Sequence, residues 1–167
     1  EYSQKKEKKN AERCFREAKK MPYSYSDVAK DAFDLYVDWQ RSRMYVDEKE
    51  EIPLLIDIVW RNPFLAFVHK RIGDSFYHLK EHKKAIFWYR NAERVLNDTE
   101  KQKNKLNEAE FKDIDVSLWD MMALVFYYLK DYKNAIKYAQ KAIEKKPDDE
   151  RMKKNLELYE KMKESEE

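Results

Sequence analysis

The sequence predicts an all-α protein, a solenoid of antiparallel helix pairs that ends in a C-terminal capping helix. The first observation is an internal repeat: FYHLKEHKKAIFWYRNA at residues 76–92 returns as FYYLKDYKNAIKYAQKA at residues 126–142. Such self-similarity is typical of repeat proteins, in which each unit buries its apolar face only against its neighbours. The second observation is the composition. The 167 residues include only one Gly and four Pro, so the chain has few of the residues that form tight turns between strands. The third is that apolar residues recur at helical spacing within both copies.

The charge balance and the rarer residues exclude several classes of protein. The 35 basic and 33 acidic residues leave a net charge of +2, whereas a general nucleic-acid binder carries a clear basic excess. The single cysteine, Cys14, allows neither an internal disulfide nor a cysteine-based zinc site. No run of 18 apolar residues is present, so no transmembrane segment is predicted. One glycine also rules out a glycine-rich phosphate loop.

The first 22 residues are predicted to be a partial repeat. KEKKNA at residues 6–11 aligns with KEHKKA at 80–85 and KDYKNA at 130–135. This register places a turn at residues 6–8 and a helix from there to residue 20, which Pro22 ends. Because the first helix of this pair is cut short, we expect the native polypeptide to extend upstream of Glu1. One helical face then carries Ala11, Phe15 and Ala18.

Residues 24–62 are predicted to be a divergent helical pair. Ser24 or Ser26 would cap the first helix, which runs to about residue 45. Residues 47–51 form an acidic connection. IPLLIDIVW at residues 52–60 suits a buried strand as well as a buried helix. No other segment resembles a strand partner, so we predict a helix with Pro53 in its first turn.

Residues 64–99 are predicted to be the first full repeat. Asn62 would cap its first helix and Pro63 would occupy the first helical position. Gly73 lies inside this helix, where glycine costs about 1 kcal/mol against alanine, so a close approach between helices is expected to compensate. A turn over residues 80–82 leads to the second helix, whose inner side carries Ala85, Ile86, Tyr89, Ala92 and Leu96.

A polar insertion at residues 100–115 precedes the second full repeat at residues 116–147. The run NDTEKQKNKLNEAEFK at 97–112 is expected to extend the flanking helices in part, with a mobile loop as the alternative. Asp115 or Ser117 would cap the next helix, Ser117 with Asp120 as a capping box. Residues 148–167 are predicted to be the capping helix that keeps a solenoid soluble. Its apolar face carries Met152, Leu156, Tyr159 and Met162.

Two segments of the chain resemble the tetratricopeptide repeat (TPR) family, whose unit is a helix–turn–helix of about 34 residues. The matching residues are Ile72, Gly73, Phe76, Ala85, Tyr89 and Ala92 in 66–99, and Trp119, Ala123, Phe126, Tyr132, Ala135, Ala142 and Pro147 in 116–149. The sequence departs from the family at His69, where Trp is usual, at Asn97, where Pro is usual, and at Ala139, where an aromatic is usual. The resemblance implies a single TPR-like domain over residues 1–167, with right-handed stacking and a concave groove.

One string has a catalytic form. Residues 78–82, HLKEH, match the H-x-x-E-H pattern of inverted zinc metallopeptidases. That chemistry needs both histidines on one unbroken helix. The equivalent string YLKDY at 128–132 binds no zinc and lies at an inter-helix turn, so we expect the helix to break between His78 and His82. A metallopeptidase-like zinc site at His78, Glu81 and His82 stays an alternative, and no catalytic residue, metal or cofactor is predicted.

The resemblance implies a non-enzymatic scaffold that binds a protein or peptide in the groove. One TPR group clamps C-terminal carboxylates with Lys, Asn and Arg of the inner helices, but Asp74 and Asp120 stand among those slots here and would repel a carboxylate. A purely architectural, self-associating solenoid is a further alternative. Tyr77 and Tyr127 occupy the same place in the two repeats and are expected to anchor the partner. The predicted partner-binding residues are Phe67, Lys70, Asp74, Tyr77, His78, Ser117, Asp120, Leu124, Tyr127 and Tyr128.

Overall fold

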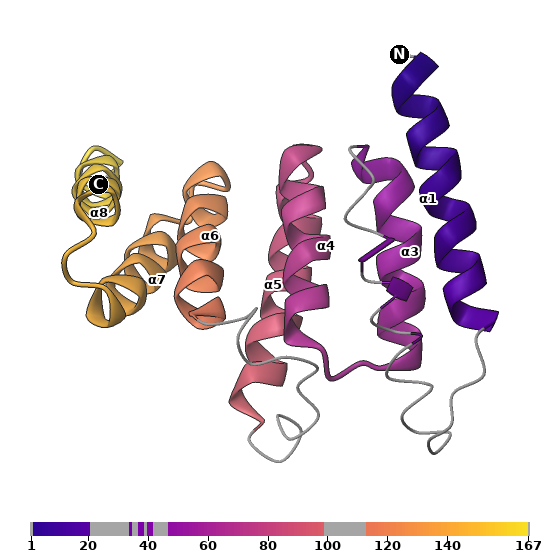
Figure 1. The fold of residues 1–167 in the computed structure, drawn as a ribbon. Coiled ribbons are helices and arrows are strands. Elements are labelled where there is room, and N and C mark those ends of the chain that lie inside the picture. The colour runs from indigo at the N-terminus through magenta and orange to yellow at the C-terminus, as the bar shows by residue number, and fades with distance from the viewer. Residues whose placement is uncertain are drawn as a thin grey trace. The chain divides into compact units, whose positions relative to one another are not determined.

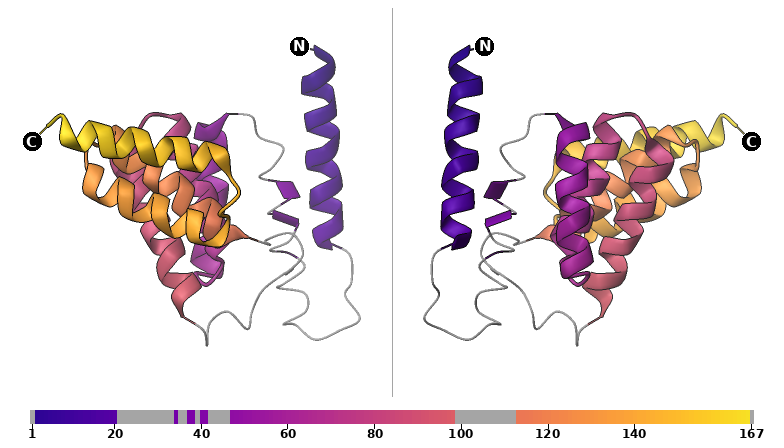
Figure 2. Two further views of the ribbon diagram at one scale, coloured as in Figure 1. Left: turned by 90° about the vertical axis from the view of Figure 1, so that its left-hand side faces the viewer. Right: turned by 90° about the vertical axis from the view of Figure 1, so that its right-hand side faces the viewer.

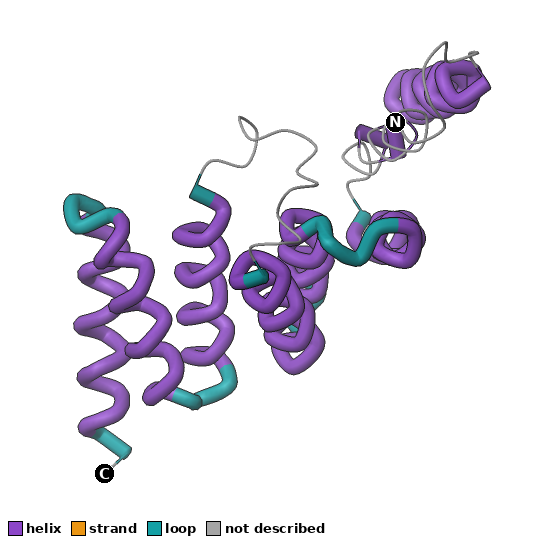
Figure 3. The backbone as a smooth tube through the Cα atoms, turned by 90° about the horizontal axis from the view of Figure 1, so that it is seen from below, coloured by secondary structure: helices purple, strands orange, loops and turns teal. Residues whose placement is uncertain are grey.

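The computed structural model of the chain describes residues 2–20, 34, 37–38, 40–41, 47–98 and 113–166. All regular structure in these ranges is helical, as predicted (Figure 3). None of the described helices is long and apolar enough to cross a membrane. Figure 1 labels the helices, which are α1 (Tyr2–Lys20), α3 (Glu48–Arg61), α4 (Ala66–His78), α5 (His82–Asn97), α6 (Ile114–Tyr128), α7 (Tyr132–Lys145) and α8 (Glu150–Glu164).

The chain divides into two compact units, Glu1–Pro63 (unit 1) and Phe64–Glu167 (unit 2), which are described separately. The single domain over residues 1–167 therefore stays a prediction. Most of the helix predicted at 24–45 and nearly all of the polar insertion, residues 99–112, lie outside the described residues. The candidate site lies wholly within unit 2.

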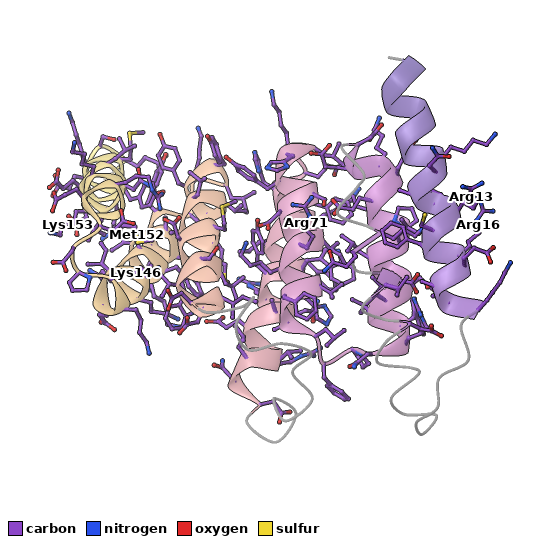
Figure 4. All side chains as sticks on the ribbon, in the orientation of Figure 1. Arg13, Arg16, Arg71, Lys146, Met152 and Lys153 are labelled. Atoms are coloured by element: carbon purple, nitrogen blue, oxygen red, sulfur yellow. The ribbon has the colours of Figure 1, made fainter. Side chains whose placement is uncertain are left out.

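In unit 1, α1 is one unbroken helix, so the turn predicted at residues 6–8 is wrong. Lysine and glutamate are good helix formers, and nothing in the local sequence alone breaks a helix there. Figure 4 shows Arg13 and Arg16 on the side of α1 that faces away from α3. Ion pairs hold the unit together: the buried Asp38 carboxylate accepts from Lys19 of α1 at 2.7 Å and from Arg61 of α3 at 2.5 Å.

Helix α3 of unit 1 confirms the helical interpretation of residues 52–60 but begins earlier than predicted. The Asp47 carboxylate accepts the Lys49 amide at 2.8 Å and starts the helix at Glu48. Three glutamates in the first turn favour this start because they complement the helix dipole. Residues 47–51 are therefore not a connection, and Pro53 lies inside the helix beyond its first turn.

The boundary between α3 and α4 also differs from the prediction. The backbone N–H of Asn62 donates to the Ile58 carbonyl at 2.9 Å, so Asn62 closes α3 instead of capping the next helix. Helix α4 then begins at Ala66, after Leu65, and Pro63 stands outside it. Asparagine is common both at the start and just after the end of a helix, so the local sequence did not decide which of the two helices Asn62 caps.

In unit 2, α4 packs along α5, α6 along α7, and α7 along α8 (Figures 1 and 2). Ala85 and Ala135, which occupy equivalent places in the two helix pairs, are both 0% exposed. As predicted, α8 closes the stack with an apolar face. Met152 packs with Val116 and Ala142 on the side of α8 toward α7 (Figure 4).

Gly73 lies where α4 packs tightly against α5, which agrees with the predicted reason for a glycine inside a helix. A Cβ atom added there would stand 2.4 Å from two ring carbons of Tyr89, far inside van der Waals contact. The Tyr89 ring is fully buried and its hydroxyl donates to Asp74 Oδ1 at 2.8 Å, so it cannot easily move away. Glycine is required here for space.

Both hairpins turn through the same backbone motif. In the first turn the Glu81 amide donates to the Phe76 carbonyl at 2.9 Å and the Lys80 amide to the Tyr77 carbonyl at 2.9 Å. These are the two hydrogen bonds of a Schellman motif, which usually has glycine in the left-handed position. Here lysine takes that position, with φ 60° at Lys80 and φ 59° at Lys130.

Candidate functional site

The predicted partner-binding residues of α4 are divided between the interior and the surface. Phe67 is 9% exposed, so little of its side chain can touch a partner. Lys70 and Asp74 form an ion pair at 2.9 Å along the helix, and both side chains are largely buried. Asp74 also accepts the Tyr89 hydroxyl, and burial, followed by the nearby Asp74 charge, raises the pKa of Tyr89. The positive charge of Lys70 and the negative charge of Asp74 therefore neutralise each other within this pair.

On α6 the equivalent acidic residue is also paired. Asp120 accepts two hydrogen bonds from the Arg151 guanidinium of α8, at 3.3 and 2.9 Å. The hydrogen bond that Arg151 donates to this carboxylate raises the pKa of Arg151. Asp74 and Asp120 therefore repel an anion less than their sequence positions suggest, because each carboxylate already has a cationic partner. Leu124 lies between Asp120 and the end of α6, and its side chain is half-buried.

Ser117 is exposed, as a partner-binding residue must be, but it does not cap α6. Its amide donates to the Asp113 carbonyl at 3.1 Å, which is already a bond of the helical ladder. The helix begins at Ile114 after Asp113, so the predicted capping box of Ser117 and Asp120 is wrong. Asp115 lies within the first turn and its carboxylate accepts the Val116 amide at 2.9 Å.

Aromatic side chains from both hairpins meet where α4 and α6 end. The ring of Tyr77 lies 6.1 Å from that of Tyr128 and 5.9 Å from that of His82, centroid to centroid. His82 stacks on Tyr128 at 4.9 Å, with the two planes 5° apart. Burial, followed by a hydrogen bond with Tyr128, raises the pKa of Tyr77. We call the whole group the aromatic cluster, and its members are Tyr77, His82, Tyr127, Tyr128, Tyr132 and Tyr159.

The other half of the aromatic cluster reaches the capping helix. Tyr127 lies 5.6 Å from Tyr128, 6.0 Å from Tyr132 and 5.1 Å from Tyr159 of α8. Tyr159 is only 2% exposed, and burial raises its pKa. Tyr128, by contrast, is 50% exposed and is the most accessible large side chain of the cluster. The cluster is thus anchored in the core through Tyr159 and open to solvent at Tyr128.

The helix break predicted within the string HLKEH is confirmed. Helix α4 ends at His78 and α5 begins at His82, with the left-handed Lys80 between them. The Glu81 carboxylate pairs with Lys84 at 3.1 Å. Across the described ranges no three His, Cys, Asp or Glu side chains are grouped as a metal site requires. His78 is exposed, with its ring 5.7 Å from that of Tyr77 at the edge of the aromatic cluster, and His82 is a member of the cluster.

Sequence reasoning did not assign three side chains to the partner-binding region: Arg151, His82, which it named only in the zinc alternative, and Tyr159, which it named only on the apolar face of the capping helix. A signal for His82 was present, because the repeat aligns it with Tyr132, and the Tyr77–His82 contact is matched by Tyr127–Tyr132 at nearly the same distance. Arg151 and Tyr159 lie on α8, which has no counterpart in the repeat, so the alignment carried no information about them.

A partly buried carboxylate links the two hairpins away from the aromatic cluster. Glu93 of α5 accepts hydrogen bonds from Trp119 Nε1 at 3.2 Å, the Tyr138 hydroxyl at 2.8 Å and Lys141 Nζ at 3.0 Å. Burial raises the pKa of Glu93, but the hydrogen bonds from Lys141 and Tyr138 outweigh it and bring the pKa below its ordinary value. Burial and the same contact raise the pKa of Tyr138 to about 12. The network fixes α6 and α7 against α5.

Comparison with known proteins agrees with this geometry. The tetratricopeptide repeat family matches residues 116–149, which cover α7 and all but the first two residues of α6. A crystal structure of MamA protein is similar over 94% of this chain and 78% of its own, with 16% sequence identity and a TM-score of 0.64. No curated protein sequence matches the chain. The similarity to MamA concerns the fold, and with the family match it confirms the predicted all-α, TPR-like class.

Proposed function

We propose that this chain, a tetratricopeptide-repeat protein by the match at residues 116–149, is a non-enzymatic scaffold that binds a protein or peptide partner along α4 and α6. Protein–protein interaction is the general role of such repeats, and stacked helix pairs provide extended binding surfaces for it. The finer proposal is that the aromatic cluster is the centre of the binding surface, with Tyr77 and Tyr128 as its anchors.

The observation that carries the proposal is the half-exposed Tyr128 at the open end of a cluster anchored in the core. Tyrosine is enriched in interfaces because its ring is large, stiff and amphipathic. The neighbouring rings of Tyr77 and His82 restrict Tyr128, so less conformational freedom is lost when a partner covers it. Surface lysines and glutamates elsewhere in unit 2 offer no such rigid apolar surface.

The test replaces the accessible part of the cluster and leaves its anchor intact. Tyr77→Ala with Tyr128→Ala removes two rings, whereas Tyr127 is kept because it stacks on Tyr159 and supports α8. Each central aromatic contributes about 2 kcal/mol to an interface, near thirtyfold in affinity. Phe87→Ala is the matched control, because Phe87 is an exposed aromatic (59%) of α5 outside the cluster.

The measurement is affinity capture from a lysate of the source organism, after circular dichroism has established equal helicity. We expect specific proteins to bind the parent and Phe87→Ala and to be lost from the double variant. Equal capture by the double variant, or loss with Phe87→Ala alone, contradicts the proposal. Light scattering over a range of concentrations detects self-association, which is the architectural alternative.

A further inference from the structure

We infer that the partner is an acidic peptide segment with interspersed apolar side chains, bound where exposed lysines of the two hairpin turns flank the aromatic cluster. This inference rests on the proposed function, because it assigns a chemistry to the partner of the same surface. We call this region the turn edge. It comprises residues 79–84 and 129–134, that is, the two turns and the first residues of α5 and α7.

Four lysines project from the turn edge. Lys80 and Lys130 occupy the left-handed positions of the two turns, and both are exposed. Lys83 and Lys133 follow directly after the cluster residues His82 and Tyr132, and both are exposed as well. The internal repeat therefore places the same two cations beside an aromatic ring in each hairpin.

These four ammonium groups form no ion pair with any described residue, unlike the other charges nearby. Lys84 pairs with Glu81 at 3.1 Å, and Lys70 of α4 pairs with Asp74 at 2.9 Å. The Asp131 carboxylate is occupied by Asn134, whose amide and side-chain Nδ2 donate at 3.2 and 2.7 Å. Both hairpin turns thus carry exposed lysines without an acidic partner directly beside the aromatic cluster.

The two turns are neighbours in space. His82, which opens α5, stacks at 4.9 Å on Tyr128, which closes α6, and Tyr77 closes the triangle at 5.9 and 6.1 Å. A peptide that crosses from one turn to the other therefore passes over the rings and has lysines on both sides. Apolar side chains suit the rings, and carboxylates suit the ammonium groups, which steer and orient a charged partner.

The charge pattern favours a peptide over a nucleic acid. Glu81 lies between Lys80 and Lys83, and Asp131 lies between Lys130 and Lys133. A nucleic-acid strand carries a charge at every nucleotide and is held in a continuous positive groove. Carboxylates within the row of lysines interrupt such a groove, whereas the acidic side chains of a peptide can be spaced to avoid them.

The experiment uses the full chain and a displayed library of short random peptides, selected in parallel on several variants. The charge variant is designed to fold, because asparagine tolerates the left-handed position and glutamate complements the start of a helix. Its substitutions are Lys80→Asn, Lys130→Asn, Lys83→Glu and Lys133→Glu. A control variant makes the same change in net charge on exposed lysines elsewhere, with Lys137→Asn, Lys145→Asn, Lys154→Glu and Lys161→Glu. Tyr77→Ala with Tyr128→Ala is the third variant.

We expect the parent to select peptides rich in Asp and Glu with apolar residues between them. Fluorescence anisotropy of a selected peptide should show roughly tenfold weaker binding to the charge variant, little change with the control, and weakening by salt. Selection of neutral or basic peptides that still need Tyr77 and Tyr128, or tighter binding of single-stranded polyuridylate than of acidic peptides, overturns this inference and leaves the proposed function standing. If no peptide is selected, this inference is overturned and the proposed function is judged by affinity capture alone. If selected peptides do not need the two tyrosines, both are overturned.

Discussion

The hairpins α4–α5 and α6–α7 share a turn and a buried alanine but differ in the residues that fill the helix crossing. In the first hairpin Gly73 receives the ring of Tyr89, whereas the equivalent positions of the second hold Ala123 and Ala139. The second hairpin places its aromatic ring one residue earlier, at Tyr138, where it stacks on Phe126 at 5.5 Å. The same hairpin backbone therefore accommodates two different packings. The first pairs a glycine with a tyrosine at the helix crossing, and the second pairs two alanines there and places its tyrosine one residue earlier.

The outer faces of the two hairpins differ as well. Glu93 of the first hairpin accepts three hydrogen bonds from the second, and Ile143 stands at the equivalent position of the second hairpin. Ile143 packs against the small cluster that contains Met152 of α8. An internal repeat can thus use a polar contact toward another repeat and an apolar contact toward a cap. The difference shows that the repeat conserves the hairpin and leaves the contact with the next element free to vary.

The largest effect is expected where the hairpins are alike. Ala85→Leu and Ala135→Leu each force a bulky side chain into a fully buried contact between paired helices, at a cost of about 1–3 kcal/mol. Chemical denaturation followed by circular dichroism measures both. Similar losses support the shared packing plan. A variant that unfolds like the parent shows that its alanine is not at the helix crossing.

The two hairpins should respond differently to substitution of the small residue in the first helix, which is Gly73 in α4 and Ala123 in α6. Gly73→Ala drives a methyl group into the Tyr89 ring, and we expect it to lower the unfolding free energy by about 1–2 kcal/mol despite the better helix propensity of alanine. Ala123→Gly is the control and should cost about 1 kcal/mol through helix propensity, together with the lost burial of one methyl group. Combining Gly73→Ala with Tyr89→Leu should cost less than the sum of the single changes. Strict additivity would mean that the two residues do not share the space.

The Glu93 network should make the contact between the hairpins sensitive to pH. Glu93→Gln removes the ion pair with Lys141 and is expected to cost about 1–2 kcal/mol at neutral pH. Because the folded pKa of Glu93 lies below its ordinary value of 4.5, this stabilisation is present above that pH and is lost as the pH falls through the folded pKa. The difference between parent and variant should therefore disappear in acid. Glu81→Gln, which removes an exposed pair, should cost less than about 0.5 kcal/mol at any pH.

The smallest effect is a gain at the shared turns. Lys80→Gly and Lys130→Gly relieve the left-handed strain of a residue with a Cβ atom, and each should raise stability by up to about 1 kcal/mol. Gln140→Gly, inside α7, is the control and should be destabilising by roughly the same amount. Destabilisation by both turn substitutions would show that the lysine side chains support the turns. That result would also leave fewer free cations at the turn edge.

The repeat carried most of the fold prediction for unit 2. Comparison of two copies located both turns and the buried Ala85 and Ala135, because a packing constraint met twice leaves the same residue types twice. The tight packing at Gly73 was indicated instead by a single glycine inside a predicted helix. Where a segment had no copy or only a weak copy elsewhere in the chain, local sequence patterns predicted some turns and helix boundaries wrongly. Residues 6–8 look like the two turns, but helix propensity alone kept them in α1.

The site was only partly predictable for a related reason. Tyr77, Tyr127 and Tyr128 were placed by the repeat, and they do come together. The ion pairs that occupy Asp74 and Asp120 depend on side-chain reach within one helix and across to α8, which sequence spacing alone did not reveal. Nor did the sequence indicate that the turn lysines adopt left-handed backbone conformations, because glycine usually marks such positions. Contacts with a non-repeating element must be seen in the structure.

The most direct test of the central claim, that the open end of the aromatic cluster binds a protein, is site-specific photocrosslinking. A photoreactive phenylalanine analogue replaces Tyr128 in one version of the full chain and Phe87 in another, since both side chains are exposed aromatics of unit 2. After irradiation in a lysate of the source organism, adducts are resolved by mass and identified. The account predicts discrete adducts at position 128, suppressed by Tyr77→Ala, and none at position 87. Adducts at position 87 with none at position 128 would contradict it.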